Sequence, residues 1–162
     1  MKRKSIFIAE TVMIGVAYVV LVLALQPISF MVVQVRLADA LLPLSMVYGW
    51  SAILGLTIGC AIANLYSPVP QMIVDVIMGS IANFLATYAA YRVGRDSPFR
   101  ILVGSMVEAL IVTLIVGSYL AILLNVPFEF SYLGVGIGSL ISIIVVGSPI
   151  AITLSRYVKR SH

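Results

Sequence analysis

The chain has 162 residues, of which 62% are hydrophobic and 10% are charged, and its mean hydropathy is +1.15. Soluble domains carry about 25% charged residues, so this composition excludes an ordinary soluble domain and predicts an all-α integral membrane protein with a single membrane domain over residues 1–162. The formal net charge of +4 comes from basic residues that flank apolar runs. That placement is typical of membrane topology signals, and we expect no nucleic-acid partner.

Six apolar segments follow one another along the chain, separated by proline, glycine and polar residues that end helices. A helix needs about 20 apolar residues to cross the hydrocarbon core, although short spans occur. The predicted spans cover, approximately, residues 5–25, 36–48, 52–66, 73–92, 101–124 and 132–156. The first apolar run is longer than the core of a signal peptide, so we expect it to be a retained first span.

The basic residues predict the orientation of these spans. Six crossings put both termini on one side of the membrane, and with both termini in the cytoplasm only Arg36 lies on the outer face. The remaining basic residues all lie on the inner face: Lys2, Arg3, Lys4, Arg92, Arg95, Arg100, Arg156, Lys159 and Arg160. Cytoplasmic loops are enriched in Lys and Arg. The sequence therefore predicts a six-transmembrane-helix bundle in the cell (plasma) membrane, a multi-pass protein with cytoplasmic N- and C-termini.

Four polar side chains stand in or at the ends of these apolar segments: Arg36, Asp39, Asn64 and Asp75. A charge at the bilayer centre costs roughly 2.5–3.5 kcal/mol, so such residues usually face a cavity or a partner. The predicted topology brings all four to the outer face, which points to a pocket for a small molecule. The structural alternatives are an interfacial ion pair between Arg36 and Asp39 and simple helix capping by Asp75.

A stripe of small and polar residues continues down the fourth span, at every fourth position. Its members are Asp75, Gly79, Asn83 and Thr87, and Ser139 and Ser142 on the sixth span are weaker members of the same lining. Groups aligned in this way face protein or water and not lipid. We interpret the stripe as part of the ligand pocket, with hydrogen bonding of the serine hydroxyls to their own helix as the alternative.

Glu108 lies far from either end of the fifth span. It needs a partner, a proton or a polar cavity, and the two interpretations are a ligand contact and a structural hydrogen bond, for which Asn83 is the candidate partner. No nucleophile elbow, phosphate loop or histidine pair is present. We therefore expect no catalytic residue, no metal site, no directly bound cofactor and no direct use of ATP.

Small residues predict where helices approach closely. Gly55, Gly59 and Ala63 recur at every fourth position of the third span, and Thr11 and Gly15 have the same spacing on the first. Such faces let helix backbones pack tightly. For the third span we expect packing inside the bundle. For the first span, internal packing and contact with a partner helix are both open.

Three segments resemble the QueT-type proteins, which are substrate-binding subunits (S-components) of energy-coupling factor (ECF) transporters associated with queuosine precursors. QVRLADAL at residues 34–41 resembles their Q-x-R-x-x-E-A-L segment. GLTIGCAIANL at residues 55–65 resembles G-L-x-x-G-x-x-x-A-N-L, and DVIMGSIA at residues 75–82 resembles D-x-x-x-G-[ST]-x-A. The run VAYVVL at residues 16–21 is similar to the end of their first helix.

The resemblance implies a six-helix S-component with an outward-facing pocket. Its partners are a membrane coupling protein (T-component) and two cytoplasmic ATPases, so that ATP is used by the partner subunits. Thr11 and Gly15 would then pack against the coupling protein. The implied ligand is a queuosine or archaeosine precursor or a related 7-deazapurine, namely preQ0, preQ1 or queuine.

Three positions depart from the family pattern. Ser139 stands where an acidic residue is expected, Glu108 where Asn is expected, and Asn83 where Thr is expected. A pocket carboxylate suits a ligand amine such as the aminomethyl group of preQ1. Its loss at Ser139 and gain at Glu108 could relocate that contact or indicate a different ligand.

Three further hypotheses stay open. One is an S-component for another small nutrient, such as a water-soluble vitamin. The second is a small membrane enzyme acting on a lipid or isoprenoid, which would need an acid/base pair or metal-binding carboxylates near the interface, with Arg36, Asp39 and Asp75 as the candidates. The third is a scaffold subunit with no ligand, in which Asp75→Ala and Asn64→Ala cost only stability.

Overall fold

The computed structural model describes residues 2–26, 36–68, 71–95 and 97–160, and within them it contains helices and no strand. This confirms the all-α prediction. Segment 27–35, which includes Gln34 of the first motif, lies outside the described residues. The regular helices are α1 (Lys2–Ala24), α3 (Ser45–Tyr48), α4 (Trp50–Asn64), α5 (Met72–Val93), α6 (Pro98–Leu124), α7 (Phe128–Ser139) and α8 (Ser148–Arg160). The 3-10 helix η1 (Leu37–Leu44) and the π-helix η2 (Leu140–Gly147) complete the bundle.

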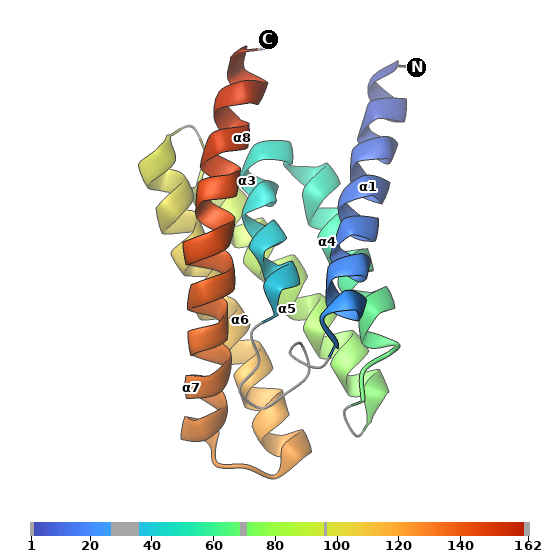
Figure 1. The fold of residues 1–162 in the computed structure, drawn as a ribbon, viewed down its shortest axis with the longest axis vertical. Helices are drawn as coiled ribbons and strands as arrows, with labels where there is room; N and C mark the ends of the chain where they lie inside the picture. The colour runs from blue at the N-terminus through green and yellow to red at the C-terminus, as the bar shows by residue number, and fades with distance from the viewer. Residues whose placement is uncertain (1, 27–35, 69–70, 96, 161–162) are drawn as a thin grey trace.

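The helices run lengthwise, and both chain termini lie at one end of the bundle, called here the terminal end (Figure 1). The turn between α3 and α4 and the connection from α5 to α6 lie toward the same end, whereas the connections from α4 to α5 and from α6 to α7 lie at the far end. α1 packs on α4, although η1 and α3 separate them in the sequence, and the consecutive helices α4, α5, α6 and α7 pack side by side in that order.

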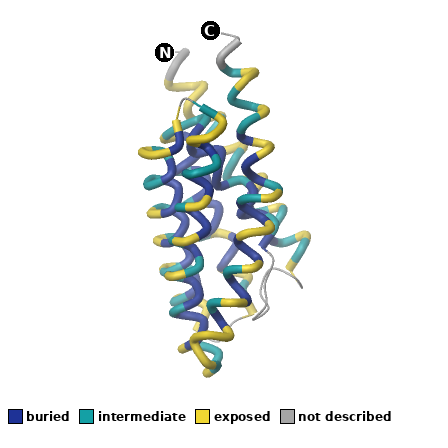
Figure 2. The backbone as a smooth tube through the Cα atoms, turned by 90° about the vertical axis from the view of Figure 1, so that its left-hand side faces the viewer, coloured by how far each residue is buried: buried dark blue, intermediate teal, exposed yellow. Residues whose placement is uncertain are grey.

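Each helix turns its buried residues toward the inside of the bundle and its exposed residues outward (Figure 2). The outward-facing surface is largely apolar. Large hydrophobic side chains are exposed on every long helix, for example Met13, Ile73, Leu110 and Val145. Four helical stretches are long and apolar enough to cross a membrane: Lys4–Ala24, Met72–Val93, Pro98–Leu124 and Phe128–Val158. An apolar exterior of this extent suits contact with lipid and not with water. The segments Leu37–Tyr48 and Trp50–Asn64 are shorter apolar helices.

The second apolar segment differs from the regular short helix expected over residues 36–48. It forms the 3-10 helix η1, followed by the single α-turn of α3, and ends at Gly49, whose φ of 63° favours glycine. Pro43 lies inside η1 and has no N–H to donate, which disfavours a regular α-helix there. η1 packs against η2 and also contacts α1, α4, α5 and α6, so the shortest segment occupies the centre of the bundle.

The last apolar segment changes from an α-helix to the wider π-helix η2 at the level where it contacts η1. Pro149, two residues after the end of η2, has no N–H to donate to the carbonyl one turn earlier. The backbone N–H of Ser148 donates to the carbonyl of Ile143, five residues earlier, which is the π pattern. Gly147 ends η2 directly against η1: a Cβ placed on it would lie 2.6 Å from the Ala40 carbonyl oxygen and 3.0 Å from Pro43 Cγ. The missing side chain at Gly147 therefore allows the two irregular helices to touch.

A second close approach joins α1 to α4. A Cβ on Gly15 would lie 2.9 Å from the Gly55 carbonyl oxygen, and a Cβ on Gly59 would lie 2.8 Å from the Gly15 carbonyl oxygen. The small residues of α4 thus pack inside the bundle, as expected, and Gly15 is their counterpart on α1.

Candidate functional site

The four polar residues singled out from the sequence come together in the middle of the bundle, where all are buried. Arg36, at the start of η1, donates from Nη2 to Asn64 Oδ1 of α4 at 2.8 Å. Asn64 in turn donates from Nδ2 to the backbone carbonyl of Asp75 on α5 at 2.9 Å. Asp39 lies one turn after Arg36, and its backbone N–H donates to the Arg36 carbonyl at 2.9 Å. One hydrogen-bonded chain therefore connects η1, α4 and α5.

Two tyrosines that the sequence analysis did not identify complete this group. Tyr18 of α1 is fully buried and donates its hydroxyl to Asp39 Oδ1 at 2.8 Å. Tyr119 of α6 donates its hydroxyl to Asp75 Oδ1 at 2.5 Å. A buried tyrosine hydroxyl usually has a polar partner, which is the signal that could have indicated both. We call the six residues Tyr18, Arg36, Asp39, Asn64, Asp75 and Tyr119 the polar cluster.

The polar cluster carries more acidic than basic groups. Asp39 and Asp75 contribute two carboxyl groups, and Arg36 contributes one guanidinium group. Asp75 Oδ1 is bonded to Tyr119, but its Oδ2 atom is buried and accepts no hydrogen bond from any described residue. Because a buried carboxylate oxygen without a donor is costly, Asp75 Oδ2 is the position in the cluster that most needs a further donor.

A small void of about 10 Å³ adjoins the cluster. It is lined by Arg36, Asp39, Asn83, Val112, Val116, Val135 and Ser139. This volume is roughly the minimum that holds one water molecule and is far below the pocket of about 300 Å³ or more that small-molecule ligands usually occupy. At this level the side chains therefore fill nearly all of the space between the helices.

The polar stripe of α5 faces inward, and each of its members is buried. Gly79 leaves room for the Asn64 amide, because a Cβ at this position would lie 2.5 Å from Asn64 Nδ2. Asn83 lines the void and donates to the Leu56 carbonyl at 3.5 Å. Thr87 donates to the Asn83 carbonyl of its own helix at 2.6 Å. Gly79 thus shapes the cluster from outside the void, and Thr87 has a local role.

Glu108 lies outside the lining of the void and is completely buried. Its partner is Ser45 of α3, which donates to Glu108 Oε1 at 3.1 Å, and not Asn83 as the sequence had suggested. Glu108 Oε2 accepts no hydrogen bond from a described residue. Ser45 follows Asp39 by two turns of a 3-10 helix, so the Glu108–Ser45 pair lies nearer the terminal end than the polar cluster.

An apolar groove runs along the outside of the contact between α1 and α4. Its volume is about 310 Å³, and its lining comprises Thr11, Val12, Gly15, Val16, Val19, Val20, Gly55, Ile58, Gly59 and Ile62. The Thr11 hydroxyl donates to the Phe7 carbonyl of its own helix at 2.8 Å, so its hydrogen is already bonded within α1. Thr11 and Gly15, the predicted partner contacts, therefore lie in a surface groove as well as beside α4.

Comparison with known proteins agrees with the motifs described above. The sequence matches the QueT transporter family over residues 8–156, which is nearly the whole chain. No curated protein and no solved structure matches it significantly. The match and the exposed apolar helices together describe a multi-pass transport protein of the plasma membrane. The chain belongs to the QueT transporter family.

Proposed function

We propose that this protein is the substrate-binding S-component of an ECF-type importer and that its ligand is a queuosine precursor or a related 7-deazapurine. The observation that carries the proposal is the polar cluster. Six polar side chains from five elements converge inside a bundle whose exterior is apolar. A bundle that serves only as a scaffold does not need ionisable groups at its centre, where they are expensive.

The membrane topology proposed is six crossings with cytoplasmic termini. Both termini lie at the terminal end of the bundle (Figure 1), and the helix ends and the α5–α6 connection on that side carry Lys4, Arg92, Arg95, Arg100 and Arg156. Arg36 lies in the interior, where it bonds Asn64. This distribution follows the positive-inside rule. With the terminal end in the cytoplasm, the polar cluster would lie toward the outer half of the bundle.

The charges in the cluster favour a ligand that brings a cationic nitrogen. Asp39 and Asp75 are opposed by Arg36 alone, and Asp75 Oδ2 lacks a donor among the described residues. An ammonium group bonded to Asp75 would supply that donor and balance the second carboxylate. The aminomethyl group of preQ1 has this chemistry, whereas the nitrile of preQ0 does not.

Binding requires the closed site to open. The void of about 10 Å³ cannot hold a purine-sized molecule, so the ligand must displace side chains or separate helices. The valines that line the void, Val112 and Val116 on α6 and Val135 on α7, offer an apolar wall for a planar ring once it enters.

The proposed partners are a membrane coupling protein and two cytoplasmic ATPases, which use the ATP. The groove between α1 and α4 suits the coupling protein, because its apolar lining includes the exposed side chains of Val12, Val16 and Ile58, which can pack against another membrane helix. Thr11 and Gly15 lie on this surface.

Ligand-dependent melting of the purified protein in detergent tests the proposal. A ligand that binds only the folded state raises the melting temperature in proportion to ln(1 + [L]/Kd). We expect larger shifts with preQ1 and queuine, which carry a cationic amine, smaller shifts with preQ0 and guanine, and none with water-soluble vitamins. A shift with a vitamin alone would replace the ligand assignment, and folded protein that responds to none of these compounds would contradict the proposal.

The substitution Asp75→Asn tests which residue receives the cationic group. It keeps the shape of the side chain and removes its charge, so we expect it to abolish the preference for preQ1 over preQ0. Glu129→Gln makes the same change of charge on an exposed residue of α7 and serves as the matched control. Equal preference in both variants would remove Asp75 from the site.

A further inference from the structure

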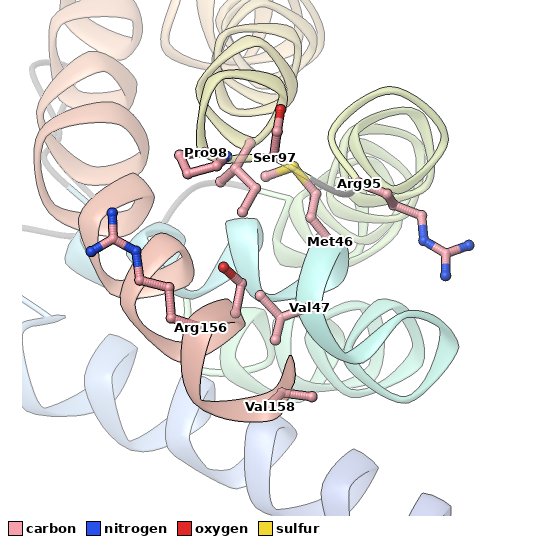
Figure 3. A pocket seen from close by; sticks show the side chains of 9 residues that line it. Met46, Val47, Arg95, Ser97, Pro98, Arg156 and Val158 are labelled. Atoms are coloured by element: carbon pink, nitrogen blue, oxygen red, sulfur yellow. The ribbon is translucent and has the colours of Figure 1, made fainter. Parts of the chain in front are cut away.

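A second cavity, shown from close by in Figure 3, lies between α3, the start of α6 and α8 at the terminal end of the bundle. Its volume is about 200 Å³, which makes it much larger than the void beside the cluster. The lining comes from α3, the start of α6, the connection before α6, and α8: Met46, Val47, Arg95, Ser97, Pro98, Ile101, Ser155, Arg156 and Val158. No residue of the polar cluster lines it, and the proposed transport function does not use it.

The floor of this terminal-end cavity is apolar and depends on two glycines. Met46, Val47 and Ile101 form the floor. A Cβ on Gly94 or on Gly104 would collide with the sulfur atom of Met46, so the Met46 side chain fills the space that both glycines leave. The floor is therefore a packed surface with a defined shape.

The mouth of the cavity is basic. Arg95 and Arg156 flank it from opposite sides, with their guanidinium groups directed outward in Figure 3. Arg156 makes no hydrogen bond or ion pair with the described residues, and Arg95 donates only to the hydroxyl of Tyr91, at 3.2 Å, with its guanidinium 4.8 Å from that ring. Among the described residues that line the cavity none is acidic. As far as the described residues go, both long side chains can therefore turn toward an anion without leaving an ion-pair partner.

The first turn of α6 adds to this positive potential. Ser97 caps the helix by accepting a hydrogen bond from the Arg100 N–H at 3.2 Å, and Pro98 occupies the first turn. The positive end of the dipole of this 27-residue helix therefore points at the cavity wall.

Two exposed aromatic residues indicate the depth of the cavity in the membrane. Phe99, next to Pro98, is 73% exposed, and Tyr157, next to Arg156, is 67% exposed. Aromatic side chains of this kind concentrate at the level of the lipid headgroups. An apolar floor below two arginines at headgroup depth fits an amphipathic anion, with its phosphate at the mouth and its glycerol and first methylenes on the floor.

We propose that the terminal-end cavity binds the headgroup of an anionic phospholipid from the adjoining leaflet, with Arg95 and Arg156 holding the phosphate. The site is independent of the polar cluster and of the ligand that the cluster takes. It would fix the rotation of α8 against α6 at the membrane surface.

Binding of phosphatidylglycerol to purified protein, followed by native mass spectrometry and by melting in mixed micelles, tests this inference. Phosphatidylcholine provides the zwitterionic reference. The double variant Arg95→Gln/Arg156→Gln should bind phosphatidylglycerol about 10- to 30-fold more weakly, the loss expected for two arginines at an anionic surface. The control Lys4→Gln/Arg92→Gln removes the same charge from the same end outside the cavity. Equal losses in the two double variants would reduce the effect to general electrostatic attraction and overturn the proposal.

A substitution that fills the cavity tests the role of its volume apart from the role of the two arginines. Ser155→Leu leaves both arginines in place and occupies the cavity, so it should also abolish the selectivity for phosphatidylglycerol while the protein melts normally in phosphatidylcholine. Retained selectivity in this variant would overturn the proposal. Glycerol phosphate serves as the soluble competitor: displacement of the lipid at equal affinity would assign the site to a soluble phosphate and not to a lipid.

Discussion

Helices α1 and η1 follow one another in the chain and differ in nearly every physical respect. α1 has 23 residues of regular helix, and most of its apolar side chains are exposed. η1 has eight residues in a 3-10 conformation, contains a proline, and is buried on almost all sides. Arg36 and Asp39 belong to the short segment, whereas α1 contributes only Tyr18 to the polar cluster.

The difference shows how this small bundle separates two tasks. The long helices provide apolar surface to the lipid, where only hydropathy is required of their sequence. The short central segment brings charged groups inward, where each needs a partner. Irregular backbone is tolerated at membrane depth when protein surrounds it, and η1, enclosed by α1, α4, α5, α6 and η2, meets that condition.

The largest effect is expected for Arg36→Gln, at the start of η1. The change leaves Asp39 and Asp75 buried without their cation, and breaking a buried charge pair costs about 3–5 kcal/mol. Chemical unfolding in detergent measures the loss. Met13→Ala on α1, at a residue that is 72% exposed, is the control and should change stability by less than about 0.5 kcal/mol. Similar values for the two variants would remove the distinction between the segments.

A smaller loss is expected when the contact between η1 and η2 is overfilled. Gly147→Ala places a methyl group against the Ala40 carbonyl and should cost about 1–3 kcal/mol. Gly136→Ala on α7 is the control, since its nearest neighbour would be Thr113 Cγ2 at 3.4 Å, an ordinary contact. Thermal melting of both variants compares them, and a neutral Gly147→Ala would mean that the irregular helices are not tightly packed.

Tyr119→Phe sharpens the comparison within the polar cluster. It removes the donor to Asp75 Oδ1 and leaves that carboxyl group with neither oxygen bonded by a described side chain, which should cost about 1–2 kcal/mol. It should also change ligand affinity. Tyr132→Phe removes a hydroxyl that lies 2.9 Å from Ser118 Oγ in a half-buried position and should have less effect on both measurements. An unchanged Kd in Tyr119→Phe would assign Tyr119 to packing alone.

The smallest effect is expected for Glu108→Gln. The glutamine carbonyl can accept the Ser45 hydroxyl as Glu108 Oε1 does, so unfolding should change by less than about 1 kcal/mol. Because Glu108 pairs with Ser45, nearer the terminal end than the polar cluster, ligand preference should stay the same. Melting with and without preQ1 checks both statements. An altered ligand preference would extend the site toward the terminal end.

Hydropathy and helix-breaking residues were sufficient to predict an all-helical chain and the convergence of Arg36, Asp39, Asn64 and Asp75. Long apolar runs have few alternatives to a helix in a membrane, and the order of the segments then decides which residues share an end. The local geometry at Pro43 and Pro149 was not predicted, because a proline inside an apolar segment can produce a kink, a 3-10 turn or a π-turn.

The tyrosines and the partner of Glu108 were missed for a different reason. A tyrosine in an apolar helix is compatible with lipid contact, with the interface or with the interior, and only the rotation of the helix decides among them. The pairing of Glu108 with Ser45 depends on how η1 and α3 rise through the bundle, which follows from their irregular backbone. The small volume of the void likewise depends on side-chain packing, which the sequence pattern does not specify.

Tyr18 has a position whose consequence reaches beyond hydrogen bonding. It lies one helical turn after Gly15, and its Cβ packs against the site of Gly59, so a single residue forms part of the joint between α1 and α4 while its hydroxyl holds Asp39. A molecule that binds the Asp39 carboxylate must either share it with the Tyr18 hydroxyl or displace that hydroxyl. In the second case α1 loses its hydrogen bond to η1, so a change at Asp39 would loosen the contact between α1 and α4 at the surface of the bundle.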